Sequence, residues 1–107
     1  MAAETSAPNE NVAIGGTARV RGVAVTPLAV VEDSRCPKDV TCIWAGRVLI
    51  RARIQAEGRS SEAEMELGKP FAASGNAAIV LAEVWPERTT GAGIEPADYR
   101  FAFAQAE

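Results

Sequence analysis

Residues 33–46 read Asp-Ser-Arg-Cys-Pro-Lys-Asp-Val-Thr-Cys-Ile-Trp-Ala-Gly, and they hold both cysteines of the 107-residue chain. Pro37 fixes its own φ angle and favours an extended conformation of Cys36, while Pro-Lys-Asp is a typical turn opener. Trp44 is then placed to enter the core or to cover its open end. Gly46 has no Cβ, so it tolerates a positive φ and a close approach of backbone. The stretch therefore predicts a compact connection between two strands.

The two cysteines, Cys36 and Cys42, favour a disulfide across a short loop. Five residues separate them, which excludes a redox Cys-x-x-Cys motif. An even number of cysteines in a small chain is typical of a disulfide formed in an oxidising compartment. In the chain-entropy model, a ring of this size stabilises the fold by about 2 to 2.5 kcal/mol. Two reduced and buried thiols are the alternative.

The chain contains no histidine, which removes the commonest general base and the commonest metal ligand. Ser-His-Asp and Cys-His arrangements are thereby excluded. A structural zinc site needs four ligands, so the two thiols fall short unless Asp33 and Asp39 complete the set or two chains share the ion. The simpler interpretation is that both aspartates accept backbone N–H bonds within the turn. We therefore predict no metal, no cofactor and no catalytic residue.

The segment after this stretch has the clearest two-residue period of a β-strand in the chain. Alternate residues of 48–56 are apolar. Residues 62–67 have the same two-residue period, with glutamates alternating with apolar residues. A four-residue turn at 57–60 would place Arg53 opposite Glu64 on the outer face. The same register predicts the pairs Arg51–Glu66, Ile54–Ala63 and Ile50–Leu67. The charged face indicates either a docking surface or, more simply, a solvated surface of weak ion pairs.

Strands are also expected before and after this hairpin. Residues 17–31 form a loosely alternating run, in which Pro27 predicts a bulge, a bend or an exposed edge. Residues 77–85 are apolar on both faces, which favours a central strand or a bulge near Ala82 and Glu83.

Aromatic residues in the second half of the chain are expected in the core. Residues 68–76 should form a loop from which Phe71 fills the core. Residues 98–104 should form the last strand, with three aromatic side chains on one face at the period of a strand. These are Tyr99, Phe101 and Phe103. A ligand-binding aromatic strip is the alternative, but a small core needs these side chains.

The length of the chain fits one domain. Residues 1–11 are small, polar and aperiodic, which is typical of a disordered lead-in or tether, and residues 12–107 are expected to form a single β domain. No run longer than a turn has helical periodicity. The pattern predicts six to eight short strands in an antiparallel β-sandwich or a partly open β-barrel.

The formal net charge is -3 and the lysines and arginines are interspersed with acids, which disfavours nucleic-acid binding. No apolar run approaches the ~18 residues of a membrane helix. The sequence does not open with the charged and apolar segments of a signal peptide. Its first residues look like the mature end of an exported chain to which Met1 has been added for expression.

The pattern Asp-Ser-Arg-Cys-Pro, four residues, Cys-x-Trp-Ala-Gly resembles that of a family of small exported bacterial proteins, often described as lipoproteins or hypothetical proteins. The close match covers residues 33–46 and extends weakly to the flanking strands and to the final Tyr99-x-Phe-x-Phe run. The resemblance implies export, to the periplasm or beyond, and a β fold. It transfers no catalytic residue, because no activity is established for the family. The lipid-anchoring cysteine of such relatives is absent from this sequence, so lipid anchoring stays open.

Three functions are open at this point. The first is a non-enzymatic binding or structural module of the cell envelope or of the secreted fraction, whose partner is an unknown protein or envelope component. Its contact residues would be Arg35, Lys38 and Trp85, on loops at one end of the sheet. The second is a serine-protease inhibitor that presents Lys38 on the Cys36–Cys42 loop, because a rigid loop limits the cost of ordering on binding.

The third function is a small hydrolase that uses carboxylates, as glycosidases do. The chain offers several carboxylates, but none lies in a recognisable pocket-forming loop. The candidates are Glu62, Glu64, Glu66, Glu83, Glu87, Glu95 and Asp98.

Overall fold

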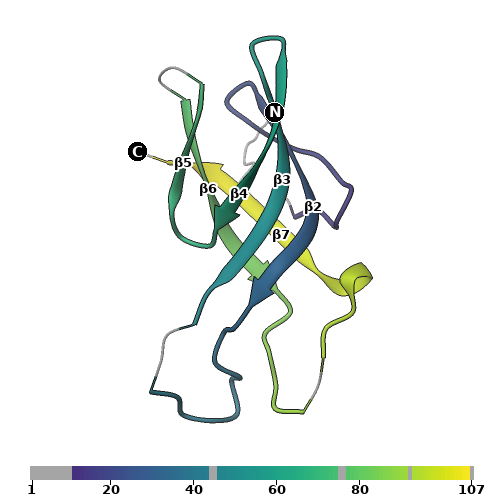
Figure 1. Ribbon diagram of the computed structural model, residues 1–107, viewed down its shortest axis with the longest axis vertical. Helices are drawn as coiled ribbons and strands as arrows, with labels where there is room; N and C mark the ends of the chain where they lie inside the picture. Colours follow the sequence, from purple (N-terminus) through teal and green to yellow (C-terminus); the bar gives the residue numbers. More distant parts are fainter. Residues whose placement is uncertain (1–10, 44–45, 75–76, 92, 107) are drawn as a thin grey trace, which may run out of the picture.

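The computed structural model describes residues 11–43, 46–74, 77–91 and 93–106, which form two antiparallel sheets (Figure 1). The first sheet has the order β1 (Ala18–Val20), β2 (Val23–Asp33), β3 (Val48–Ala56) and β4 (Arg59–Glu66). The second has the order β5 (Pro70–Ser74), β6 (Ala77–Trp85) and β7 (Arg100–Gln105), and a short 3-10 helix (Pro96–Asp98) precedes β7. The prediction of an all-β fold is confirmed, and of the two architectures it is the sandwich, since the sheets of the described residues do not close into a barrel.

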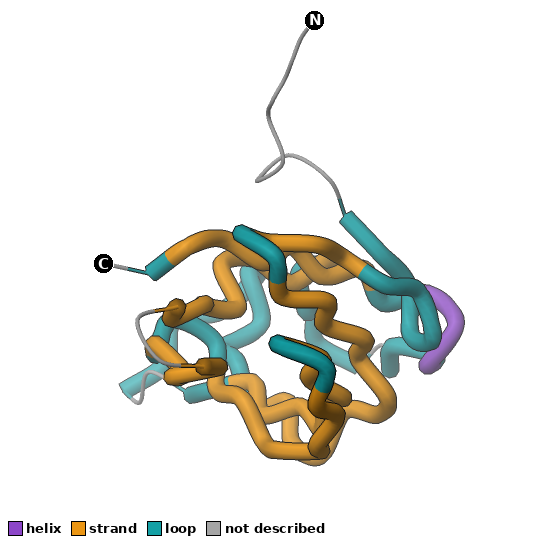
Figure 2. The backbone as a smooth tube through the Cα atoms, turned by 90° about the horizontal axis from the view of Figure 1, so that it is seen from above, coloured by secondary structure: helices purple, strands orange, loops and turns teal. Residues whose placement is uncertain are grey.

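The core lies between the two sheets, which Figure 2 shows from above. Its most completely buried large side chains come from both sheets and include Val25, Val48, Ile50, Ile79, Leu81 and Phe101. The predicted aromatic face of the last strand is in this core, because Tyr99, Phe101 and Phe103 are all buried. The rings of Tyr99 and Phe101 stack with their centroids 5.7 Å apart. Burial of each such side chain contributes about 1.5 to 3 kcal/mol.

The hairpin of β3 and β4 is present, but its register differs by two residues from the predicted one. The turn contains only Glu57 and Gly58, with φ angles of 54° and 76°, which is the conformation of a two-residue type I′ loop. Arg53 therefore pairs with Glu62 and not with Glu64. The other corrected pairs are Arg51–Glu64, Ile54–Ser61 and Ile50–Met65. A shift of two keeps every side chain on its predicted face, so the core side of β3 is unchanged.

Two further segments differ from the sequence prediction. Residues 17–31 do not form one run, because Arg21 and Gly22, at φ 53° and 82°, make a two-residue turn between β1 and β2. The loop expected at residues 68–76 contains strand β5, in which Phe71 pairs with Ile79 and packs against the core as expected. The last strand begins two residues later than predicted, because the 3-10 helix occupies its expected start.

The predicted irregularities in β2 and β6 are both present. The register of β2 against β3 shifts between Pro27 and Ala29, as expected for a proline inside a strand. In β6, the central strand of its sheet, the register against β7 shifts between Leu81 and Glu83. This bulge reverses the alternation of β6, so that Val84 faces the core.

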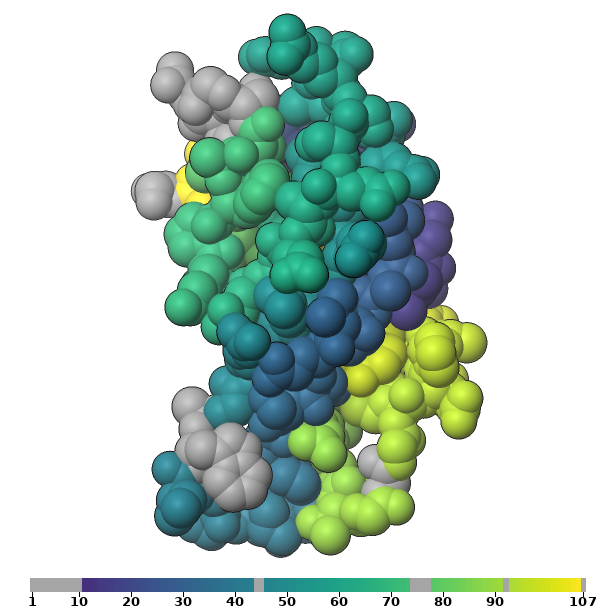
Figure 3. Space-filling view, viewed as in Figure 1, coloured from purple at the N-terminus to yellow at the C-terminus, as the bar shows by residue number. Residues whose placement is uncertain are grey.

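The connections β2–β3 and β6–β7 extend from the same end of the sandwich, at the bottom of Figure 1. In the space-filling view of Figure 3 they form the lower end of the molecule, which we call the loop end, residues 34–43 and 86–91. The turns β1–β2 and β3–β4 lie at the opposite end. None of the described residues belongs to a helix long and apolar enough to cross a membrane.

Candidate functional site

The connection between β2 and β3 is closed by the predicted disulfide. Cys36 and Cys42 are bonded to each other, with Cα atoms 6.0 Å apart. Neither is therefore a reduced thiol, and neither sulfur is free to bind zinc. No three acidic or cysteine side chains of the described ranges are grouped as in a metal site. The predicted place of Trp44 lies outside the described residues.

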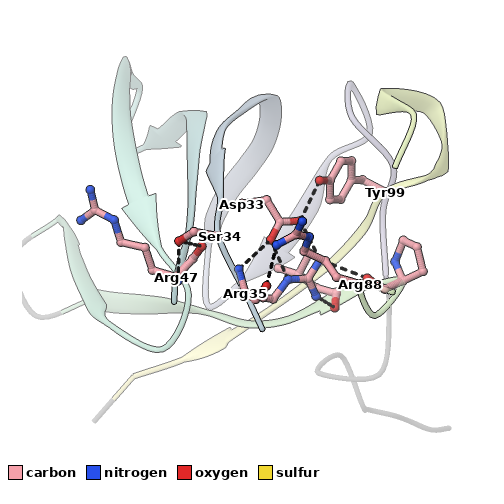
Figure 4. Close-up of polar contacts among 8 residues, drawn as sticks. Asp33, Ser34, Arg35, Arg47, Arg88 and Tyr99 are labelled. Atoms are coloured by element: carbon pink, nitrogen blue, oxygen red, sulfur yellow. Dashed lines mark hydrogen bonds and ion pairs between the residues drawn. The ribbon is translucent and has the colours of Figure 1, made fainter. Parts of the chain in front are cut away.

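Asp33, the last residue of β2, is the centre of a polar network (Figure 4). The guanidinium of Arg35 donates two hydrogen bonds to its carboxylate, from Nε at 2.9 Å and from Nη2 at 2.8 Å. The hydroxyl of Tyr99 donates to the same carboxylate at 2.8 Å. The side chains of Arg35 and Asp33 are only 17% and 9% exposed. Burial alone would raise the pKa of Asp33, but the bonds from Arg35 and Tyr99 hold it below its ordinary value.

The same arginine ties the disulfide loop to the connection after β6. Nη1 of Arg35 donates to the carbonyl of Val84 at 3.1 Å, and Nη2 donates to the carbonyl of Pro86 at 3.0 Å. In return, Nη1 of Arg88 donates to the carbonyl of Arg35 at 2.6 Å. Three charge-assisted hydrogen bonds, two from Arg35 and one from Arg88, thus hold the disulfide loop against the end of β6 and the connection that follows it.

A second set of contacts holds the tip of the disulfide loop. The backbone N–H of Lys38 donates to the carbonyl of Arg88 at 2.8 Å, and Thr90 donates to Asp39 from its backbone and its hydroxyl. These bonds, chiefly the one from the Thr90 backbone, lower the pKa of Asp39. The sequence predicted that Asp33 and Asp39 would accept backbone N–H bonds within the turn. Asp33 does so, from Arg35 at 3.4 Å, whereas Asp39 is held chiefly by Thr90. Its partner lies 51 residues further along the chain, and no local pattern specifies such a contact.

Gly46 ends the connection with the positive φ that the sequence predicted, at 70°. A Cβ at this position would overlap the carbonyl oxygen of Ser34. Ser34 is itself fixed to the start of β3, because its backbone N–H donates to the carbonyl of Arg47 and its hydroxyl oxygen accepts from the N–H of Arg47. The two ends of the connection are therefore in direct backbone contact at this glycine.

The three predicted contact residues line one open groove of about 700 Å³ beside β6. Lys38 projects from the disulfide loop with its side chain 60% exposed, and its ammonium lies 3.5 Å from Glu87. Trp85 lies at the end of β6 and is 37% exposed. Arg35 is at the base of the groove, where its guanidinium is used by the intramolecular contacts described above. The structure thus brings the three together, with two of them accessible to a partner.

The seven candidate carboxylates are spread over the molecule. Glu62, Glu64 and Glu66 project from β4 opposite residues of β3, and Arg53 is 3.5 Å from Glu62 with both side chains about half exposed. Glu83 and Glu87 line the groove, whereas Glu95 and Asp98 flank or belong to the 3-10 helix. Two carboxylates of a glycosidase have to face each other across a cleft of about 5 to 9.5 Å. Of the seven, the groove brings together only Glu83 and Glu87, and Lys38 contacts the second.

Tyr99 is the one tyrosine of the chain, so its ionisation can be followed by absorbance. Its burial, the hydrogen bond to Asp33 and the charge of that carboxylate raise its pKa from 10.0 to about 12. We expect a tyrosinate titration with its midpoint near pH 12, recorded while circular dichroism reports that the fold persists. The pKa of Tyr99 is higher in the folded than in the unfolded state. The contribution of the protonated Tyr99 hydroxyl to folding stability is therefore complete below pH 10 and is lost as the pH rises towards 12. Asp33→Asn should move the midpoint part of the way back, and a wild-type midpoint near 10 would contradict the network.

No protein-family model, curated protein or solved structure matches the chain. The interpretation of the site therefore depends on its geometry. Residues far apart in sequence fix a disulfide-closed loop against a second loop, beside an open groove. Such an arrangement presents a rigid surface at little cost in conformational entropy.

Proposed function

We propose that the protein is an exported, non-enzymatic binding module that recognises a protein partner through the loop end. The observation that carries the proposal is that large apolar side chains are exposed on the disulfide-closed connection and at the adjacent end of β6, which the Arg35 network holds together. Ile43 is fully exposed, and Val40 and Trp85 are exposed as well. Apart from Val31 on β2, these are the exposed large apolar side chains of the described residues.

Exposed large apolar side chains at one end of the molecule favour association, because a partner that covers them removes apolar area from water. Surfaces of this kind mark interaction sites, and burial of apolar area is the main favourable term in association. The contacts of Lys38, Asp39 and Arg88 restrict the loop before any partner arrives. Little ordering is then needed on binding, which favours affinity for a given area of contact.

Two observations support a place outside the cytoplasm, in the periplasm or beyond. A disulfide persists in oxidising compartments and is rare in the cytosol, and Cys36 and Cys42 form one here. The motif of residues 33–46 also resembles that of small exported bacterial proteins.

Site-directed crosslinking in the native cell tests the proposal. A photoreactive phenylalanine derivative replaces Ile43 at the loop end or, as a control, Arg59 beside the turn at the opposite end. We expect position 43 to crosslink to a defined protein and position 59 not to. With that partner purified, Ile43→Ser should weaken binding about tenfold or more, because an apolar side chain would no longer be buried. Equal crosslinking from position 59, or unchanged affinity of Ile43→Ser, would contradict the loop end as the binding surface.

A protease assay separates the proposal from the inhibitor hypothesis. Lys38 lies in a turn in which the N–H of Val40 donates to the carbonyl of Pro37 at 3.3 Å, and its ammonium contacts Glu87. Inhibition of trypsin by the wild type, lost on Lys38→Ala, would favour the inhibitor over the binding module.

A further inference from the structure

The bulge in β6 exposes Trp85. In a regular strand, residues 81, 83 and 85 would share one face, and Leu81 is fully buried in the core. The extra residue between Leu81 and Glu83 shifts the alternation, so that Val84 is buried while Glu83 and Trp85 point outward. Bulges often re-aim a side chain beside a functional site. The chain has only six aromatic residues, and this one lies outside the core with 37% of its surface exposed.

A carboxylate without an ion-pair partner among the described residues lies beside Trp85 in the groove. Glu83 lines the groove, and within the described parts of the chain no cation pairs with it. The cations nearby are engaged, since Lys38 contacts Glu87 and Arg35 contacts Asp33. Arg100 is the cross-strand neighbour of Trp85, but its Nη1 donates to the carbonyl oxygens of Ala97 and Tyr99.

We propose that this groove binds an arginine or lysine side chain of the protein partner, with the cation over the indole of Trp85 and beside the carboxylate of Glu83. A tryptophan face is the best aromatic platform for such a cation. The walls on either side are apolar or uncharged at Leu67, Gly68 and Pro86, which suits the aliphatic part of these side chains. The inference rests on the proposed function for the identity of the ligand as part of a protein.

The groove adjoins the loop end, because Lys38 belongs to the disulfide loop and also lines the groove. A partner that covers the apolar tip of the loop can therefore reach Trp85 with one cationic side chain. The apolar contact would provide affinity, and the cation would fix the orientation of the partner, since charged contacts contribute mainly to specificity.

A titration with short peptides tests this site without the natural partner. The probe is acetyl-Gly-Arg-Gly-amide, and its matched neutral probe carries citrulline, which has the shape of arginine without its charge. The readout is the indole N–H signal of Trp85 in a two-dimensional NMR spectrum, assigned with Trp85→Phe. We expect a saturable shift with the arginine peptide and, from the size of cation–π contacts, binding of the citrulline peptide weaker by about two- to fivefold.

Two variants of equal charge change test whether the arginine peptide binds beside Glu83. Glu83→Gln should weaken binding of the arginine peptide by about two- to fivefold, as for the loss of a solvated ion pair. Glu95→Gln, which changes the net charge equally but lies outside the groove, should leave it unchanged. The site would be overturned by the absence of a saturable shift, by equal binding of both peptides, or by equal effects of the two variants.

These outcomes differ from a failure of the proposed function. The peptide titration probes only the groove. If it is negative while position 43 still crosslinks to a protein, the cation site is contradicted and the binding surface at the loop end is not. Conversely, a shift of Trp85 with the arginine peptide, together with no crosslink from position 43, would support the groove as a cation site and contradict the loop end as the binding surface.

Discussion

Replacing Gly46 by alanine is expected to destabilise the protein by about 3 to 4 kcal/mol, which is severe for a single surface-loop substitution. The left-handed conformation alone costs an alanine about 1 to 2 kcal/mol. The new Cβ would also overlap the carbonyl oxygen of Ser34. This oxygen cannot move freely, because Ser34 is hydrogen-bonded to Arg47 at the start of β3. Relief of the overlap would therefore separate the ends of β2 and β3, and urea unfolding followed by circular dichroism would measure the loss.

Gly58→Ala is the matched control for this prediction. Gly58 has nearly the same φ, 76°, but a Cβ there would meet nothing within 4 Å. Its substitution should cost only the conformational part, about 1 to 2 kcal/mol. The difference between the two variants isolates the backbone contact with Ser34. Equal losses of stability would mean that this contact is loose in solution and would contradict the predicted effect.

The sequence predicted the faces of the strands better than their register. The alternation in residues 48–56 and 62–67 places the same side chains inward for any even shift. The register itself depends on the turn, where Glu57 and Gly58 adopt positive φ angles. The usual signals for such a turn are Asn-Gly and Asp-Gly. Because glutamate is not a usual first residue of this turn, the pattern gave no reason to prefer two residues over four. The Arg21-Gly22 turn was missed for the same reason.

The disulfide and the positive φ of Gly46 could be predicted because both are local. The rest of the loop end is held by contacts between residues far apart in the chain. Asp33 accepts from Tyr99, 66 residues away, and Arg35 donates to Val84, 49 residues away. A buried tyrosine hydroxyl usually has a hydrogen-bond partner. The sequence therefore indicates that Tyr99 has such a partner, but it does not identify Asp33 as that partner. The choice of partner follows from the way the two sheets pack, which one sequence does not specify.

Replacing Asp33 by alanine is expected to cost about 3 kcal/mol, since it leaves the guanidinium of Arg35 largely buried without its counter-charge. It also removes the acceptor of the Tyr99 hydroxyl, and an unsatisfied buried donor costs about 1 to 3 kcal/mol. The exposed pair of Arg53 and Glu62 provides the control. Glu62→Gln should change stability by less than about 1 kcal/mol, because solvent screens that pair. Urea unfolding near neutral pH measures both variants.

The pH dependence of stability in a further variant, Asp33→Asn, separates the effect of the charge of Asp33 from that of its shape. The folded state holds the pKa of Asp33 below its ordinary 3.8, because the bonds from Arg35 and Tyr99 outweigh the effect of burial. The contribution of the carboxylate is therefore present above pH 3.8 and is lost as the pH falls through the folded pKa. Asp33→Asn keeps the shape and an acceptor oxygen but lacks the charge. Its deficit in unfolding free energy against the wild type should be constant near neutral pH and shrink in acid. A deficit that stays the same in acid would contradict the charge-based origin of this stability and would assign it to the shape of the side chain.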